Sequence, residues 1–164
     1  MNTIQIRSAT KTDIPAITHI RNEAIEEKIA TLDESKHTLE YEENWLNDHV
    51  FPYGVWIAKE HKNLLGWTSL NKFSTRPAYK YVADLSVYVS RTSRGKGIGT
   101  LLLDFVVKTA KKNGFHKIVL SGFSFNTPAM ALYKKFGFRD VGIYLEQGKL
   151  NGEWVNVILM EKLL

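Results

Sequence analysis

The stretch from Arg91 to Thr100, RTSRGKGIGT, combines three positive side chains with a glycine at every second position from 95 to 99. Glycine lets backbone N–H groups point into one concavity without Cβ obstruction, and the start of a helix favours negative charge. Such a site would bind a phosphate or a pyrophosphate, with the cations completing it. A flexible surface loop has the same composition, so the pattern alone leaves both interpretations open.

Two common phosphate motifs do not fit this stretch. The nucleotide P-loop has four residues between its first glycine and a Gly-Lys-Ser/Thr triplet, and the dinucleotide fingerprint is G-x-G-x-x-G. The run here is G-x-G-x-G after an arginine. If the stretch binds an anion, it does so in another type of site.

The composition excludes several other chemistries. The 164 residues contain no cysteine, which excludes disulfides, thiolate metal sites and a cysteine nucleophile. The histidines are scattered without H-E-x-x-H spacing, and no Ser-His-Asp order stands out, so we expect no metal and no acyl-enzyme. The net charge of +5 at pH 7 is compatible with binding of a phosphorylated small molecule or of nucleic acid. No known nucleic-acid-binding motif is present, so we expect no nucleic-acid partner.

The chain length is typical of one domain, and we expect a single domain over residues 1–164. The N-terminus has no apolar core of signal-peptide type, and no apolar run approaches the roughly 18 residues of a membrane helix. Together with the lack of cysteine, these features predict a cytoplasmic protein without membrane contact.

Alternating and helical patterns predict a mixed α/β sheet with helices on its faces. A helix over 14–24 follows Asp13, a second follows Thr38 as its cap, and two more are expected over 99–114 and from Thr127 towards Gly137. Strands are predicted over 3–9, 54–60, 64–73, 82–90 and 117–123, followed by a hairpin of 137–150 and 153–163. The glycine stretch therefore lies between a strand and a helix.

With these elements in place, Arg94-x-x-Gly97-x-Gly99 resembles the Gln/Arg-x-x-Gly-x-Gly/Ala motif of the GCN5-related N-acetyltransferases (GNAT), which binds the pyrophosphate of acetyl-coenzyme A. The segments VADLSVYVS, RGKGIGTLLL and NTPAMALYKKFGF, with the final hairpin, are similar to the phosphinothricin and methionine-sulfone acetyltransferase branch. The resemblance runs from IRSATKTDIPAI to the C-terminus. It implies the GNAT fold, a central mixed, mostly antiparallel twisted sheet flanked by helices, with acetyl-CoA in a cleft between splayed central strands.

The resemblance also implies the cofactor contacts. Arg94 and the backbone from Gly95 through Lys96, Gly97, Ile98 and Gly99 to Thr100 would bind the pyrophosphate. Arg91, Lys96 or a nearby lysine would meet the 3′-phosphate. In the family the pantetheine arm lies along the preceding strand, here the main chain of Val87, Tyr88 and Val89. Asn126 matches a position that helps hold the cofactor, and a helix cap is its alternative role.

Acyl transfer from a thioester to an amine requires the amine as its free base, although an α-amino group titrates at about 8. Asp84 stands where the branch usually has glutamate, which implies that it removes the proton through a water or holds the ammonium group. An acid with a purely structural role is the alternative. Tyr133 matches the tyrosine with which many family members protonate the departing thiolate, where phosphinothricin enzymes more often have histidine; packing in the core is its alternative role.

The predicted function is transfer of the acetyl group of acetyl-CoA directly to the primary amine of a small amino acid or amino-acid analogue in a ternary complex. The similarity of RPAY to this branch implies that Arg76 binds a substrate carboxylate, with Trp67, Phe73 and Tyr79 along the substrate side chain and the loop at 29–32 opposite. A solvated arginine and core aromatics are the alternative.

Two other functions remain open at this stage. A protein or peptide N-acetyltransferase would use the same cofactor site with a more open acceptor groove, and a noncatalytic sensor would bind acetyl-CoA without turnover. Relatives commonly form homodimers, so we expect a homodimer, with the exposed strands of the C-terminal hairpin as the candidate interface.

Overall fold

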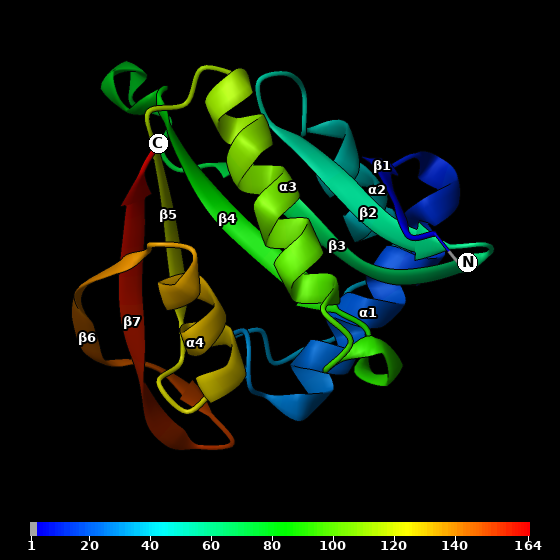
Figure 1. The fold of residues 1–164 in the computed structure, drawn as a ribbon. Coiled ribbons are helices and arrows are strands. Elements are labelled where there is room, and N and C mark those ends of the chain that lie inside the picture. The colour runs from blue at the N-terminus through cyan, green and yellow to red at the C-terminus, as the bar shows by residue number, and fades with distance from the viewer. Residues whose placement is uncertain (1–2) are drawn as a thin grey trace.

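The computed structural model describes residues 3–164, and its strands form one seven-stranded sheet in the order β1-β2-β3-β4-β5-β7-β6 (Figure 1). The strands are β1 (Gln5–Ser8), β2 (Gly54–Glu60), β3 (Asn63–Lys72), β4 (Val82–Val89), β5 (Lys117–Gly122), β6 (Arg139–Leu150) and β7 (Glu153–Leu163). Neighbouring strands are antiparallel except β4 and β5, which are parallel. The expected mixed, mostly antiparallel sheet is confirmed.

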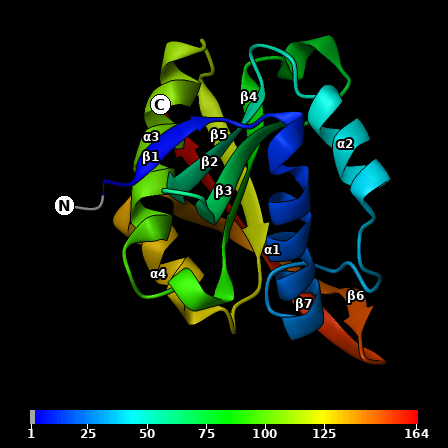
Figure 2. The same cartoon turned by 90° about the vertical axis from the view of Figure 1, so that its right-hand side faces the viewer.

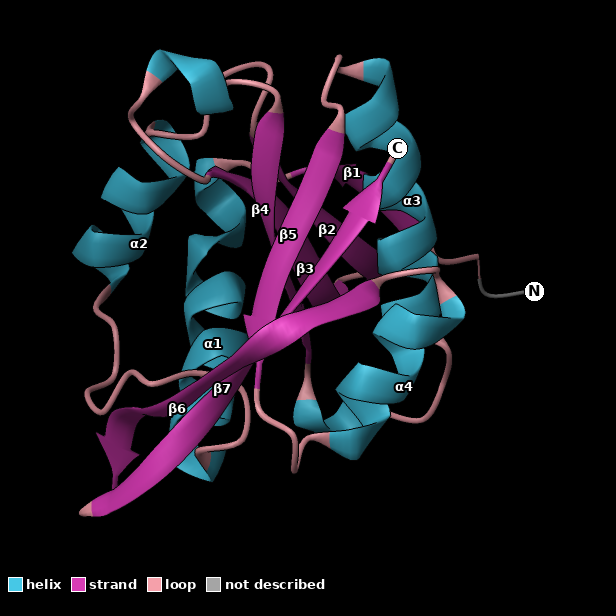
Figure 3. Ribbon diagram, turned by 90° about the vertical axis from the view of Figure 1, so that its left-hand side faces the viewer, coloured by secondary structure: helices cyan, strands magenta, loops and turns pink. Residues whose placement is uncertain are grey.

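Helices cover both faces of this sheet. The helices α1 (Ile14–Glu27) and α2 (Leu39–Asn47) lie on one face, and α3 (Ile98–Lys112) and α4 (Thr127–Lys135) lie on the other (Figures 2 and 3). Ile17, Ile57 and Trp67 are fully buried on the α1 face, and Leu103 and Ile118 on the α3 face. Each fully buried aliphatic side chain contributes roughly 1.5–3 kcal/mol to folding. Among residues 3–164, no helix has the length and apolar character needed to cross a membrane.

Short sequence signals account for the ends of several elements. The Thr38 hydroxyl accepts a hydrogen bond from the backbone N–H of Tyr41 at 3.1 Å, so the predicted cap of α2 is confirmed. Asn151 and Gly152 both have positive φ, as the predicted hairpin turn requires. The helix α1 continues to Glu27, beyond the predicted end at residue 24, because Ile25 extends its buried face.

The central strands β4 and β5 pair over a short stretch only. Val82–Asp84 pair with Lys117–Val119, and within the described residues no strand pairs with this side of β4 from Leu85 to Val89. The other side of β4 pairs with β3 as far as Val89. Figure 1 shows β4 and β5 diverging towards α4. The splayed central strands that the resemblance implied are therefore present.

Candidate active site

Two cavities open beside the unpaired half of β4. The first, here called the Asp84 cavity, has a volume of about 400 Å³. The second, called the glycine-loop cavity, has a volume of about 650 Å³ and runs along β4 to the start of α3. The two cavities share six lining residues, Ala30, Val87, Tyr88, Asn126, Ala129 and Tyr133. A molecule lying in one cavity can therefore contact a molecule in the other.

The turn before α3 has a backbone conformation that requires glycine at two positions. Gly95 and Gly97 have φ of 73° and 80°, which side chains other than glycine rarely adopt. Gly99 lies inside α3, where an added Cβ would be 3.1 Å from a methyl group of Leu132. The backbone of this turn thus approaches the cavity closely at the positive end of the α3 dipole.

Most residues of the expected cofactor site line the glycine-loop cavity. They are Val87, Tyr88, Val89, Arg94, Gly95, Gly97, Ile98, Gly99, Thr100, Asn126 and Tyr133. Lys96 is the member of the expected set that does not line it, because its ammonium group turns back to the Thr92 carbonyl oxygen at 2.9 Å.

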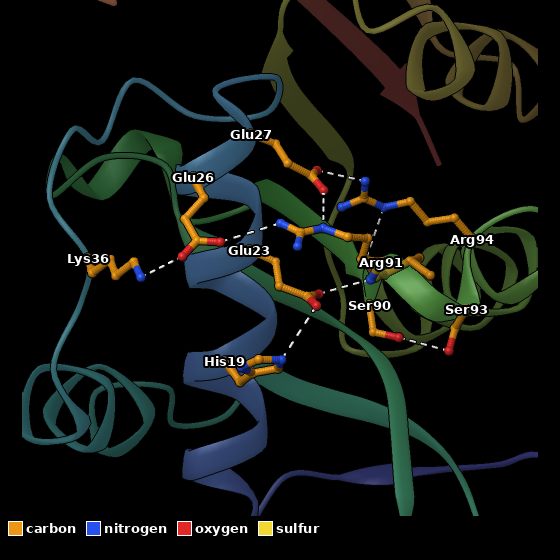
Figure 4. Close-up of polar contacts among 10 residues, drawn as sticks. His19, Glu23, Glu26, Glu27, Lys36, Ser90, Arg91, Ser93 and Arg94 are labelled. Carbon is orange, nitrogen blue, oxygen red and sulfur yellow. Dashed lines mark hydrogen bonds and ion pairs between the residues drawn. The ribbon is translucent and has the colours of Figure 1, made fainter.

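The arginines of this turn are bound to carboxylates of α1 (Figure 4). Glu27 accepts hydrogen bonds from Arg91 and from Arg94, each at 2.6 Å, and Glu23 accepts one from the backbone N–H of Arg91. Desolvation opposes the charge on Glu27, yet the hydrogen bonds from both arginines outweigh it and hold the pKa of Glu27 below its ordinary value. The arginine expected to bind pyrophosphate therefore has an internal anionic partner.

Asp84 lies on β4 and faces the α1 and α2 side of the sheet. Its cross-strand neighbour is Asn71, whose Nδ2 is 3.4 Å from Asp84 Oδ2. Burial raises the pKa of Asp84 to about 6, although the hydrogen bond from Asn71 acts in the opposite direction. At neutral pH the group is ionised yet basic enough to accept a proton from a nearby amine.

Tyr133 comes from α4 on the opposite face and lines both cavities. Burial, followed by unfavourable interactions with Tyr88 and Asp84, raises the pKa of Tyr133 well above its ordinary value. The phenol thus stays neutral and is a weaker acid than the reference value of about 10 implied. Its environment favours donation of a hydrogen bond over full release of a proton.

Asn126 does not cap α4, since its side chain makes no capping hydrogen bond there. Its Nδ2 donates instead to the Ile29 carbonyl oxygen at 3.1 Å. This bond ties the loop after α1 to the start of α4 at the point where the two cavities meet. The loop residues Ala30, Thr31 and Leu32 line the Asp84 cavity, and their role as a wall of the substrate site stays a prediction.

The residues expected to bind the substrate side chain and carboxylate lie elsewhere. Arg76 and Tyr79 are exposed in the connection between β3 and β4, and neither lines either cavity. Tyr79 packs edge-on against Phe73, with ring centroids 5.4 Å apart. Trp67 is fully buried beneath Tyr88, against which it stacks. A substrate role for Arg76 and Tyr79 therefore stays a prediction.

Several polar residues of the Asp84 cavity were not predicted from the sequence. They are Ser86, Ser121, Tyr144 and Gln147. The last two come from β6, where the pairing with β7 shifts register between Tyr144 and Gly148. No local sequence motif marks Tyr144 and Gln147 as cavity residues, because they lie in this irregular part of the β6 pairing. Asp84 is the one charged side chain among the described residues that line this cavity. Within residues 3–164, no group of three or more histidine, aspartate or glutamate side chains could hold a metal ion.

Comparisons with known proteins agree with this geometry. Residues 17–138 match the model of the acetyltransferase (GNAT) family. The phosphinothricin N-acetyltransferase of Streptomyces coelicolor is 28% identical, over 97% of this chain and 95% of its own length. The crystal structure of a ribosomal-protein-alanine N-acetyltransferase from Brucella melitensis has a TM-score of 0.94 at 30% identity, covering 98% and 99% of the two chains. A phosphinothricin acetyltransferase from Sinorhizobium meliloti, in complex with acetyl-CoA, has a TM-score of 0.90 at 26% identity, covering 99% and 89%.

Proposed function

Because the chain belongs to the acetyltransferase (GNAT) family and is an acetyl-CoA-dependent N-acetyltransferase, we propose that it acetylates the primary amine of a small amino acid or amino-acid analogue. The observation that carries the proposal is the junction of the two cavities, with Asp84 in the wall of the smaller one. A volume of about 400 Å³ suits a small acceptor. The name of the S. coelicolor relative, whose substrate is an amino-acid analogue, points the same way.

The glycine-loop cavity fits acetyl-CoA. Its glycine turn presents backbone N–H groups and Arg94 to a pyrophosphate, and the unpaired half of β4 offers main-chain groups to an extended amide-containing arm. When bound, acetyl-CoA supplies an activated acyl group in the form of a thioester. Tyr133 stands at the junction of the cavities, where its phenol can donate a hydrogen bond to a developing thiolate.

In the proposed reaction Asp84 binds the acceptor ammonium group and accepts its proton, directly or through a water. The free amine forms the C–N bond as the C–S bond of the thioester breaks, and the thiolate is finally protonated from solvent. A carboxylate of the acceptor would meet neutral donors in this cavity, the Tyr144 hydroxyl and the Gln147 amide. Arg76 is proposed to contribute only if the loop that carries it reaches the cavity in the complex.

Protein or peptide acetylation is the second candidate, because the B. melitensis neighbour is described as acting on a ribosomal protein. The test is release of coenzyme A with free amino acids, methionine sulfone, phosphinothricin, polyamines and short peptides, with mass detection of the products. Selective turnover of free amino acids or their analogues is expected. Turnover of peptides alone would replace the proposal with the second candidate, and tight acetyl-CoA binding without any turnover would favour a sensor.

A homodimer and a cytoplasmic location complete the proposal. The edge strand β6 supports the first, because it carries exposed apolar side chains, among them Ile143 and Leu145. The cytoplasmic location rests on the sequence-based expectation alone.

A further inference from the structure

Behind Asp84, on the side away from the cavity, lies a chain of polar groups that the proposed reaction does not yet use. The chain passes from Asp84 on β4 to Asn71 on β3 and then to His49, in the turn after α2. Asn71 and His49 line neither cavity. Asn71 forms hydrogen bonds with both Asp84 and His49, and so connects His49 to Asp84.

The hydrogen bonds around His49 define its protonation. His49 Nδ1 is 2.7 Å from the Trp45 carbonyl oxygen, which can only accept. His49 Nε2 is 2.8 Å from Asn71 Oδ1, which also only accepts. With the Asn71 amide in this orientation both ring nitrogens act as donors, which is the hydrogen-bonding pattern of an imidazolium ion.

The Asn71 amide has a complete set of partners in this arrangement. Its Oδ1 accepts from His49 and, at 2.9 Å, from the Ser69 hydroxyl. Its Nδ2 donates to the Ser86 hydroxyl at 3.1 Å and to the Asp84 carboxylate at 3.4 Å. The amide thus joins a positive group on one side to a negative group on the other.

Reversing the amide satisfies the same neighbours with both charges removed. Nδ2 would then donate to a neutral His49 Nε2, and Oδ1 would accept from a protonated Asp84. The two serine hydroxyls can each donate or accept, so they suit both orientations. One orientation goes with two charged groups and the other with two neutral groups.

We propose that Asn71 and His49 form a relay behind Asp84, in which the Asn71 amide couples the charge of Asp84 to the charge of His49. The proposal rests on the base role proposed above for Asp84. When Asp84 takes a proton from the acceptor ammonium, His49 releases one to solvent, so the acceptor loses one proton and the solvent gains one. His49 is only partly buried, which permits this exchange.

The other titratable groups near the relay do not provide the same coupling. Tyr88, Tyr133 and Tyr144 share the Asp84 cavity from β4, α4 and β6, and phenols are neutral near pH 7. On the α1 and α2 face, Arg21 forms a buried ion pair with Glu42, which also bonds His37. These opposite charges balance one another. Asn71 and His49 are therefore positioning residues for Asp84 and do not contact the reacting atoms.

The first test is the pH dependence of kcat/KM for the acceptor in His49→Gln, which keeps a side-chain donor for Asn71 and removes the positive charge. Loss of that charge raises the pKa of Asp84, so the acidic limb moves upward by about half to one pH unit. The expected loss is about three- to tenfold at pH 5.5 and less than about twofold at pH 8.5. Asn71→Leu is expected to move the limb in the same direction, and the exposed His116→Gln is the matched control.

An unchanged acidic limb, or the same loss at every pH, would overturn the relay, because a purely structural role lowers the rate uniformly. A second measurement needs no turnover: the ring signals of His49 are followed by NMR against pH in the wild type and in Asp84→Asn. The wild type is expected to show a coupled two-step change and the variant a single step. Identical titrations would refute the relay. If the coupling is present while Asp84→Asn retains full activity, the relay stands and the base role of Asp84 fails.

Discussion

At the scale of single residues, the site places a carboxylate and a phenol from opposite faces of the sheet at one opening. Asp84 comes from β4 on the α1 side, and Tyr133 comes from α4 on the other. Burial raises the pKa of both groups, but the consequences differ. Asp84 becomes a better base near neutral pH, whereas Tyr133 becomes a more reluctant acid.

Replacement of Asp84 with asparagine is expected to stabilise the protein at high pH while reducing turnover. Because the pKa of Asp84 is raised from 3.8 to about 6 on folding, its contribution to the free energy of unfolding is full below pH 4 and is lost as the pH rises through 6. At pH 8 the variant should be more stable by on the order of 1–3 kcal/mol, with little difference at pH 4. Urea unfolding at both pH values measures this, and lower stability of the variant at pH 8 would contradict it.

Replacement of Tyr133 with phenylalanine tests its proposed hydrogen bond. We expect kcat to fall about tenfold or more, with the Kd for acetyl-CoA within about twofold of the wild-type value, because the bond forms chiefly in the transition state. Stopped-flow turnover and calorimetric titration separate the two effects. Tyr53→Phe, which alters a tyrosine packed against Phe115, is the control. The reverse result, weaker binding with normal kcat, would make Tyr133 a binding residue only.

At the scale of elements, α1 and the glycine turn are joined by ion pairs at the entrance of the cofactor site. The end of α1 presents Glu23, Glu26 and Glu27 to Arg91 and Arg94 (Figure 4). These carboxylates hold the arginines in place, but they also repel the pyrophosphate that the turn is proposed to bind. We therefore expect ligand binding to loosen the contact between Glu27 and Arg94.

Replacement of Glu27 with glutamine is expected to lower the Kd for acetyl-CoA by about three- to tenfold at low salt, since it removes a negative charge beside the phosphates. The gain should shrink as the ionic strength rises. Glu26→Gln is the matched control, because Glu26 bonds Lys36 and Arg91 but not Arg94. Weaker binding in Glu27→Gln would show that orientation of Arg94 matters more than the repulsion.

Local signals allowed much of the element order and the glycine turn to be predicted from the sequence. The Thr38 cap, the Asn151-Gly152 turn and the glycine turn before α3 each depend on a few adjacent residues. Contacts between distant segments were not predictable in this way. His49 meets Asn71 across 22 positions, and Gln147 reaches the cavity through an irregular register of β6. The position of Arg76 outside both cavities likewise depends on the path of a loop.

At the scale of the whole molecule, β6 forms one edge of the sheet and also supplies Tyr144 and Gln147 to the Asp84 cavity. Ile143 and Leu145 on the same strand are 56% and 75% exposed. Exposed apolar side chains on an edge strand favour association with a second copy of the chain. Such an association would lie beside the acceptor site.

We therefore expect Ile143→Glu to shift the protein from dimer to monomer at micromolar concentration and to raise the KM for the acceptor more than the KM for acetyl-CoA. A charge placed in an apolar interface is strongly unfavourable. Sedimentation velocity and steady-state kinetics measure the two effects. Phe51→Glu alters another exposed apolar residue, in the turn after α2, and is the control. A dimer that persists in Ile143→Glu would place the interface elsewhere.

The gap between β4 and β5 gives the sheet an edge in its interior. Unpaired main-chain groups on a strand readily accept another extended chain. In the ligand-free protein, we therefore expect the half of β4 from Leu85 to Val89 to be able to pair with a peptide or with an unfolded segment of another molecule. Bound acetyl-CoA would block this pairing in addition to serving as the acetyl donor. Protein stored without it should aggregate sooner on heating, and the amide hydrogens on that side of β4 should exchange faster with deuterated water.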